Sequence, residues 1–236
     1  MAIKWKGIVP RTWRRLKRIF LILFILQLVY ILALKWVNPP ITITQFSSWI
    51  SGDGLKRDYI RFEEMGTYAK LAVIASEDQL FPDHNGFDLN SIKKALENNK
   101  KENARVKGAS TISQQVAKNV FLWQGRSWFR KGLEMYFTFM IELVWGKKRI
   151  LEMYLNTIEM GTGVFGIQAA AKHYFNKDAA KLTRREAALI AAVLPNPKKY
   201  QINPPTKYTS SRAGWIVQQM NILQKYPGVQ EVITKN

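Results

Sequence analysis

The chain has 236 residues, 47% of them apolar and 12% aromatic, which excludes an intrinsically disordered protein. It has no cysteine and only two histidines, His84 and His173, which excludes a disulfide framework, a cysteine nucleophile and a three-histidine zinc site. The 36 Lys and Arg against 17 Asp and Glu give a formal net charge of +19, which suits nucleic acid, anionic lipid or a phosphorylated substrate as a partner.

The N-terminal segment combines a basic tail with an apolar run. Its first 18 residues carry seven Lys and Arg and no acidic residue. Residues 19–34 are apolar except for Gln27, without the polar stripe of a core helix, and no small-residue cleavage site follows them. We therefore predict a cytoplasmic basic tail over 1–18 and an uncleaved transmembrane anchor over 19–37, with the rest of the chain on the outer face of the membrane.

The remainder of the chain has the periodicity of a helical domain. Pro39 and Pro40 end the anchor, and residues 41–53 are predicted to be extended, within a linker over 38–60. Over 61–236 the apolar residues recur at helical spacing with little strand alternation, which predicts a mainly α domain. Helices are expected over 62–77, 88–99, 110–121, 127–145, 148–159, 164–175, 183–193 and 209–225.

Two short patterns bear on the boundaries of these helices. Thr111 with Gln114, and Thr183 with Glu186, have the spacing of a capping box at a helix N-terminus. The run Gly161-x-Gly163-x-x-Gly166 has the spacing of a dinucleotide-binding loop, but the segment before it is helical in pattern and not a strand. We interpret these glycines as a turn between two helices.

Residues 121–141 are unusually aromatic for a soluble domain, with basic residues among the aromatic side chains. They are interpreted either as a core helix or as a surface that dips into the bilayer interface beside the anchor. Both interpretations can hold, because a helix has two faces.

A carboxylate pair follows an apolar helical segment. Glu77 and Asp78 come directly after Leu71–Ser76 and before a turn at Asn85-Gly86. A carboxylate at the end of an apolar helix is easily desolvated, which raises its pKa toward the range useful for proton transfer. Glu77 is therefore a candidate general base, and the alternative is that both acids only pair with nearby cations.

A second cluster has the composition of an anion site. Residues 108–119 place small and polar groups at a helix N-terminus, where backbone N–H groups and the helix dipole attract anions. Taken together, the nearby cations suit a phosphate or pyrophosphate, although each alone could be a solvated charge. These cations are Lys118, Arg126, Arg130 and Lys131. Glu134 lies three residues after Lys131 in an apolar stretch, so it should be paired or perturbed.

Five ordered motifs over residues 66–200 resemble the glycosyltransferase family that polymerises peptidoglycan and that also forms part of the class A penicillin-binding proteins. The motifs are Glu77-Asp78-x-x-Phe81-x-x-His84-x-Gly86, Gly108-x-Ser110-Thr111-Ile112-x-Gln114-Gln115-x-x-Lys118-Asn119, Arg130-Lys131-x-x-Glu134, Ile150-Leu151-Glu152-x-Tyr154-Leu155-Asn156, and Arg185–Leu189 before Leu194–Pro197. No transpeptidase domain follows by residue 236, so the resemblance is to the monofunctional biosynthetic members.

The resemblance implies a fold, a reaction and a location. The fold would be mainly α, with a lysozyme-like helical head and a small membrane-associated jaw near 121–141, preceded by one transmembrane helix. The reaction would polymerise lipid II into β-1,4-linked glycan strands with inversion and release undecaprenyl pyrophosphate. The location would be the bacterial inner membrane, with the catalytic domain periplasmic. The implied partners are lipid II, the growing glycan chain and the bilayer, without nucleic acid, and other cell-wall synthesis proteins are left open.

The resemblance also implies roles for residues of the motifs. Glu77 would be the general base on the acceptor hydroxyl, and Glu134 would be a second essential carboxylate that stabilises or orients the donor. The implied substrate-binding residues are Asp78, Ser110, Thr111, Gln114, Gln115, Lys118, Asn119, Arg126, Arg130 and Lys131. No protein metal site and no required cofactor are predicted, and a divalent cation, Mg²⁺ or Mn²⁺, at the donor pyrophosphate is left open.

Two other functions compete with this one. A lysozyme-like or lytic enzyme that cleaves peptidoglycan would also use a Glu in a helical fold, but it would not need the cation cluster or the anchor. A membrane-tethered basic module that binds nucleic acid or anionic lipid would explain the positive charge but not the carboxylate motifs.

Overall fold

The structure is a computed structural model that describes residues 8–99, 110–125 and 127–234. Backbone contacts divide the chain into two compact units, Met1–Val37 and Asn38–Asn236. The two units are described separately.

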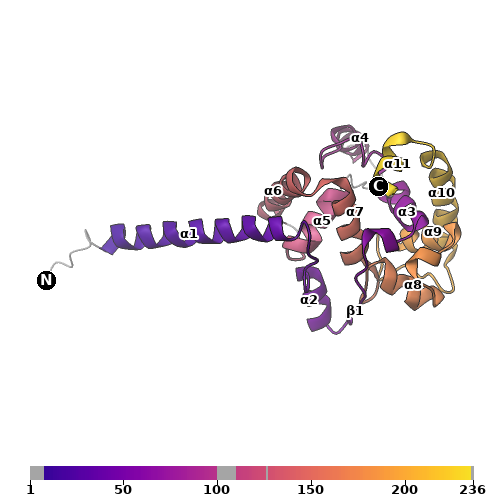
Figure 1. Ribbon diagram of the computed structural model, residues 1–236, viewed down its shortest axis with the longest axis horizontal. Coiled ribbons are helices and arrows are strands. Elements are labelled where there is room, and N and C mark those ends of the chain that lie inside the picture. The colour runs from indigo at the N-terminus through magenta and orange to yellow at the C-terminus, as the bar shows by residue number, and fades with distance from the viewer. Residues whose placement is uncertain (1–7, 100–109, 126, 235–236) are drawn as a thin grey trace. The chain divides into compact units, whose positions relative to one another are not determined.

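The described part of the first unit is dominated by helix α1 (Ile8–Ala33; Figure 1). Its Thr12–Ala33 portion contains an 18-residue window with a mean hydropathy of 2.2 and is long and apolar enough to cross a membrane. The predicted apolar helix is therefore confirmed. It ends at Ala33 and not at the expected residue 37, because the chain turns over residues 34–36, ahead of Pro39.

The second unit is mainly α, as predicted, with one very small sheet. Its helices are α2 (Ile43–Ile50), α3 (Thr67–Glu77), α4 (Leu89–Asn99), α5 (Ile112–Phe121), α6 (Trp128–Val144), α7 (Gly146–Thr157), α8 (Ile167–Phe175), α9 (Arg184–Val193), α10 (Lys207–Leu223) and α11 (Pro227–Ile233). Short 3₁₀ helices cover Phe62–Glu64 and Ala179–Lys181. Strands β1 (Lys56–Arg57), β2 (Glu159–Gly161) and β3 (Val164–Phe165) pair in the order β1-β3-β2, with β1 parallel and β2 antiparallel to β3.

Both predicted capping boxes are confirmed. At the start of α5, the Thr111 hydroxyl accepts the Gln114 N–H at 3.2 Å and the Gln114 side chain accepts the Thr111 N–H at 3.1 Å. At the start of α9, Thr183 and Glu186 exchange the same pair of hydrogen bonds at 3.2 and 2.8 Å. Each box satisfies N–H groups that have no partner within the helix, so the sequence sets these two N-termini locally.

The expected extended segment over 41–53 is wrong, because it contains helix α2. A third capping box starts this helix, in which the Thr42 hydroxyl accepts the Gln45 N–H at 3.2 Å and the Gln45 side chain accepts the Thr42 N–H at 3.0 Å. The same sequence signature is present here, but the two prolines just before it favoured an extended interpretation.

Two glycines explain the other differences from the expected helices. The expected helix over 62–77 is interrupted at Gly66, whose φ is +71° and where a Cβ would lie 2.9 Å from the Ala179 carbonyl oxygen. The expected turn at residues 161–166 is the β2–β3 hairpin, which ends at Gly166, where φ is +84° and a Cβ would lie 2.5 Å from the Asn156 carbonyl oxygen. Only glycine fits such positions without strain. Helix α11 was not predicted.

Helix α3 is the central element of the head. Its Leu71, Ala72, Ile74 and Ala75 are fully buried, and it packs against α9, α10 and α11. Helix α5 packs against α6 and α7 (Figure 1). The buried body of α3 holds its C-terminal residue, Glu77, next to α5, as the contacts below show.

Helix α6 has its apolar and polar faces reversed relative to an ordinary surface helix. Its buried residues include the polar Glu134 and Thr138, whereas its exposed face carries large apolar side chains. Those side chains are Trp128, Phe129, Met135, Phe139 and Leu143, which are between 51% and 93% exposed. Of the two interpretations of residues 121–141, this arrangement favours an apolar surface over a core helix.

Candidate active site

Glu77 is the last residue of α3 and lies among protein groups that desolvate it. The side chain of Gln115 on α5 donates a hydrogen bond to Glu77 Oε2 at 2.9 Å. Burial raises the pKa of the Glu77 carboxyl above its usual value, and Asp78 adds to this rise. The hydrogen bond from Gln115 and the charges of Arg212 and Lys118 act in the opposite direction but do not cancel the effect of burial. A carboxylate of this kind is suited to accept a proton.

Tyr154 of α7 fixes the amide that contacts Glu77. Its hydroxyl donates to Gln115 Oε1 at 3.2 Å, so the Gln115 amide nitrogen faces Glu77. Burial raises the pKa of the fully buried Tyr154 phenol well above its usual range, and the charges of Glu77 and Asp78 raise it further. The phenol therefore stays protonated and remains a donor. Tyr154 belongs to one of the motifs that resemble the glycosyltransferase family, but the resemblance implied no role for it.

Replacing Tyr154 by Phe is expected to lower turnover by about tenfold with little change in KM, because a lost hydrogen bond to a buried acceptor costs about 1–3 kcal/mol. The amide of Gln115 would then lose its fixed orientation toward Glu77. Steady-state kinetics measure the effect. Tyr174→Phe is the matched control, since the Tyr174 hydroxyl donates to the Met160 carbonyl oxygen at 3.3 Å, away from Glu77.

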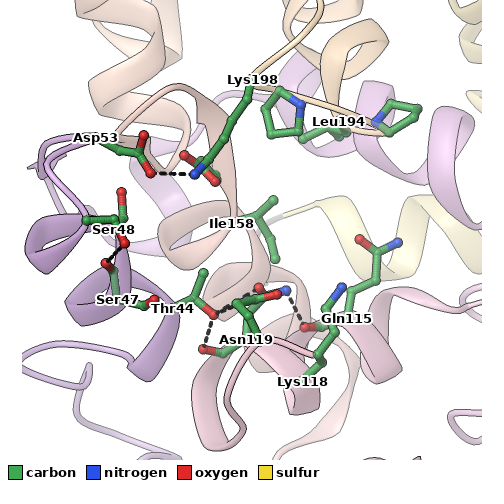
Figure 2. A pocket seen from close by; sticks show the side chains of 15 residues that line it. Thr44, Ser47, Ser48, Asp53, Gln115, Lys118, Asn119, Ile158, Leu194 and Lys198 are labelled. Carbon is green, nitrogen blue, oxygen red and sulfur yellow. Dashed lines mark hydrogen bonds and ion pairs between the residues drawn. The ribbon is translucent and has the colours of Figure 1, made fainter. Parts of the chain in front are cut away.

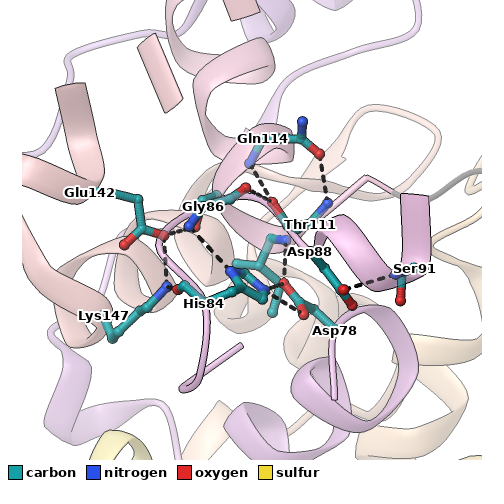
Figure 3. Close-up of polar contacts among 11 residues, drawn as sticks. Asp78, His84, Gly86, Asp88, Ser91, Thr111, Gln114, Glu142 and Lys147 are labelled. Atoms are coloured by element: carbon teal, nitrogen blue, oxygen red, sulfur yellow. Dashed lines mark hydrogen bonds and ion pairs between the residues drawn. The ribbon is translucent and has the colours of Figure 1, made fainter. Parts of the chain in front are cut away.

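Asp78 joins three segments of the head through its two oxygens (Figure 3). His84 Nε2 lies 2.9 Å from Asp78 Oδ1. The Ile112 N–H at the first turn of α5 donates to Asp78 Oδ2 at 3.0 Å. His84 Nδ1 accepts the Gly86 N–H at 3.2 Å, so the proton of a neutral ring is on Nε2, facing Asp78. Asp78 is thus positioned as a structural link between α3 and α5, and its predicted substrate contact stays a prediction.

Asp78→Asn is expected to lower the free energy of unfolding by about 1–3 kcal/mol, because an amide cannot accept at both oxygen positions and one buried donor loses its partner. Urea unfolding of the full chain in detergent measures this change. Asp83→Asn is the control, since the one side-chain hydrogen bond that Asp83 accepts from the described residues comes from the exposed Tyr226 hydroxyl, at 3.0 Å. An equal loss in both variants would contradict the role of Asp78.

Three other predicted residues, at the start and near the end of α5, are also held by internal hydrogen bonds. The Thr111 hydroxyl donates to the Gly86 carbonyl oxygen at 2.7 Å, and Gln114 closes the capping box. The Asn119 amide donates to the Gln115 carbonyl oxygen at 2.7 Å. Ser110 is exposed. Their predicted substrate contacts are not tested by these bonds.

Glu134 of α6 is the second buried carboxylate and is only 3% exposed. Arg130 donates to its Oε2 at 3.1 Å, and Lys131 pairs with its Oε1. Arg130 Nε is buried and has no hydrogen-bond partner among the described residues. A buried guanidinium N–H without an acceptor is costly, so this side of the cluster is suited to receive an anionic oxygen.

The positive charge of Lys118 on α5 interacts with both carboxylates, Glu77 and Glu134. Its ammonium group makes no hydrogen bond or ion pair within the described part of the chain. Burial lowers its pKa, and the charges of Glu134 and Glu77 both act to raise it again. Arg130 and Lys131 act on the same ammonium group with the opposite sign. The predicted base, the second carboxylate and three predicted cations therefore belong to one electrostatic cluster. Arg126, the fourth predicted cation, lies outside the described residues.

Two pockets are lined by the partners of the Glu77–Gln115 hydrogen bond, one pocket by each residue. The first, the α2–α5 pocket, has a volume of about 310 Å³ and is lined by Gln115, Lys118 and Asn119 on α5, by hydroxyl side chains of α2, and by Glu159 and Lys198 (Figure 2). The second, the α3–α4 pocket, has a volume of about 350 Å³ and is lined by Glu77. Ser110 and Thr111 also line this second pocket.

The carboxylate and imidazole groups of the described residues determine whether the protein alone can hold a metal ion. No group of three or more His, Asp or Glu in the described ranges is arranged to hold a metal ion. Both oxygens of Glu134 already contact cationic side chains. Within the described ranges, the side chains therefore do not surround a metal ion by themselves.

Sequence reasoning missed two features of the site, one of which acts on Glu77. Arg212 of α10 donates to the Ser76 carbonyl oxygen at 3.1 Å, and its charge lowers the pKa of Glu77. The hydroxyl-bearing face of α2 was assigned to a linker. The capping signature at Thr42 could have revealed α2, whereas Arg212 lies 135 residues from Glu77 in the sequence and carried no local signal.

Comparisons with known proteins identify this mainly α chain as an enzyme of the glycosyltransferase class. The transglycosylase family model matches residues 43–221. The biosynthetic peptidoglycan transglycosylase of Pseudomonas putida strain GB-1 is 50% identical, covering 91% of this chain and 93% of its own length. Proteins of the same name from Shigella boydii and Yersinia pseudotuberculosis are 48% and 47% identical, covering 88% and 94% of this chain and 93% and 95% of their own lengths. The chain belongs to the transglycosylase family.

Proposed function

We propose that the chain polymerises lipid II into β-1,4-linked glycan strands of peptidoglycan, with release of undecaprenyl pyrophosphate and inversion at the anomeric carbon. The observation that carries this proposal is the single cluster in which Lys118 lies within the electrostatic reach of both Glu77 and Glu134. Membership of the transglycosylase family and relatives named for peptidoglycan support the choice of polymer.

Glu77 acts as the general base in this reaction. It takes the proton of the acceptor sugar hydroxyl while that oxygen attacks the anomeric carbon of the donor. The bond between the anomeric carbon and the pyrophosphate oxygen breaks on the opposite face, so one displacement inverts the configuration without a covalent enzyme intermediate. A positioned base of this kind contributes about 10²- to 10⁴-fold to the rate.

The cations of α5 and α6 stabilise the leaving group. Undecaprenyl pyrophosphate departs as an anion, so it needs positive charge more than it needs a strong acid. Lys118 makes no ion pair among the described side chains, and the unpartnered Nε of Arg130 offers a further donor. Glu134 holds Arg130 and Lys131 in place by accepting from both. Its contribution is therefore to orient the two cations toward the donor.

The membrane placement follows from the substrate. Lipid II lies in the bilayer, and an enzyme in the same plane reaches it by lateral diffusion. Helix α1 serves as the single span, and the basic N-terminal tail keeps that end in the cytoplasm, which puts the second unit in the periplasm at the inner membrane. The exposed apolar face of α6 is the membrane-associated jaw, where it meets the lipid-linked donor.

Incubation with labelled lipid II tests the reaction. We expect long products that shorten on muramidase digestion and a stoichiometric release of undecaprenyl pyrophosphate. A lytic enzyme would instead release fragments from finished sacculi and would never lengthen lipid II, and that outcome would overturn the proposal.

A further inference from the structure

Helix α2 has two chemically different faces. Thr44, Ser47, Ser48 and Ser51 lie together on one side, because residues three, four and seven apart share a helix face. These hydroxyl-bearing residues line the α2–α5 pocket (Figure 2). The four apolar residues of the helix, Ile43, Phe46, Trp49 and Ile50, occupy the other side.

The hydroxyl face is fixed to the head by hydrogen bonds. Thr44 Oγ1 lies 3.2 Å from the Asn119 carbonyl oxygen and accepts the Gln124 amide at 2.9 Å. Ser48 donates to the Gly54 carbonyl oxygen at 3.0 Å. The orientation of α2 about its own axis is therefore set, and with it the direction in which the apolar face points.

The apolar face is uncovered in this unit. Ile43 and Phe46 are 42% and 47% exposed, and Trp49 and Ile50 are 60% and 67% exposed. Leaving such side chains in water is unfavourable, so a contiguous apolar face of this kind marks a contact surface.

Covalent connectivity and charge identify what covers this face. Only nine residues, 34–42, separate the end of α1 from the start of α2, which limits the separation to about 35 Å. No charged residue occurs from Trp36 to Gly52. An uncharged helix with an exposed Trp, tethered this closely to a membrane span, has the composition of an interfacial membrane helix.

We infer that α2 is a lipid-docking helix whose apolar face lies in the outer interface of the bilayer while its hydroxyl face forms a wall of the α2–α5 pocket. The partner is the lipid surface itself. This inference rests on the proposed membrane anchoring by α1. Its consequence is that the bilayer lies against the outer side of one wall of the pocket.

Because the chain has no cysteine, a single introduced cysteine can report on α2 in the full-length protein. Ile50→Cys carries an environment-sensitive fluorophore on the apolar face, and Ser47→Cys carries it on the pocket face. Asn221→Cys is the distant control, on an exposed position of α10, which lies on the other side of this unit from α2 (Figure 1). Each labelled protein is reconstituted in vesicles of phosphatidylethanolamine and phosphatidylglycerol, with doxyl-labelled lipid or aqueous iodide as the quencher.

We expect doxyl lipid to quench the label at residue 50 several-fold more than the labels at residues 47 and 221, and iodide to show the reverse order. Equal iodide quenching at 50 and 221 would overturn the inference. Shielding of residue 50 from both quenchers would also overturn it, because another protein or a second copy would then cover α2. Lipid II turnover of each labelled protein in the same vesicles separates this result from a failure of the proposed function.

Discussion

Glu77→Gln is expected to lower kcat/KM for lipid II by about 10²- to 10⁴-fold, the usual contribution of a positioned general base. Glutamine has the same shape and can still accept the hydrogen bond from Gln115, but it cannot take a proton from the acceptor hydroxyl. Initial rates of polymerisation measure the loss. Glu77→Asp retains a carboxylate one methylene further away, so it should keep part of the activity. Near-normal turnover by the glutamine variant would remove Glu77 from the mechanism.

The stability of the same variant shows whether the loss is chemical. Because the pKa of Glu77 is raised in the folded protein, the ionised carboxylate destabilises the fold as the pH rises through that pKa. Glu77→Gln should therefore unfold at the same or a higher temperature than the parent at neutral pH. The difference should vanish below pH 4.5, the ordinary value for Glu, where the parent carboxyl is protonated in both states. A clear loss of stability at neutral pH would contradict this account.

Glu134→Gln is expected to lower kcat by about 10²- to 10³-fold, as the loss of one preorganised electrostatic contact does in other enzymes. The variant leaves Arg130 and Lys131 without their shared carboxylate, so the two cations are no longer held toward the donor. Single-turnover consumption of labelled lipid II measures the chemical step separately from product release.

Glu142→Gln is the matched control for that experiment. Glu142 lies on the same helix, and its side chain, 8% exposed, pairs with Lys147 at 2.7 Å (Figure 3). It lines neither of the two pockets. Both substitutions remove half of a buried ion pair, which costs stability, about 3–5 kcal/mol in other proteins. Only Glu134→Gln should also reduce the rate measured on the folded fraction. Equal rate losses in both variants would assign Glu134 a structural role.

Local signals in the sequence account for most of the helices. The 3.6-residue periodicity predicted helices α5 and α9, and the capping boxes at Thr111 and Thr183 marked where they begin. The break at Gly66 depends on a positive φ that the tertiary contact with Ala179 imposes, so periodicity could not reveal it. Helix α2 was missed because the two prolines just before it favoured an extended interpretation of the segment.

The candidate site was predictable in its residues but not in their partners. Motif position pointed to Glu77, Lys118 and Glu134, and the structure places them in one electrostatic cluster. The contacts that tune Glu77 come from α7 and α10, distant in sequence, so only the tertiary fold reveals Tyr154 and Arg212. The hydrogen bond from the Ile112 N–H to Asp78 joins residues that are 34 apart in the sequence. It is therefore also revealed only by the tertiary fold.

The pH dependence of kcat/KM for lipid II tests most directly whether Glu77 is the base. The account predicts that the rate falls at low pH with an apparent pKa above the usual value of Glu, because only the carboxylate accepts a proton and burial raises its pKa. The positive charge of Arg212 lowers that pKa, so Arg212→Gln should move the acid limb to higher pH, whereas Arg212→Lys, which keeps the charge, should leave it near its original position. An acid limb that does not move in Arg212→Gln, or that persists unchanged in the residual activity of Glu77→Gln, would contradict the assignment.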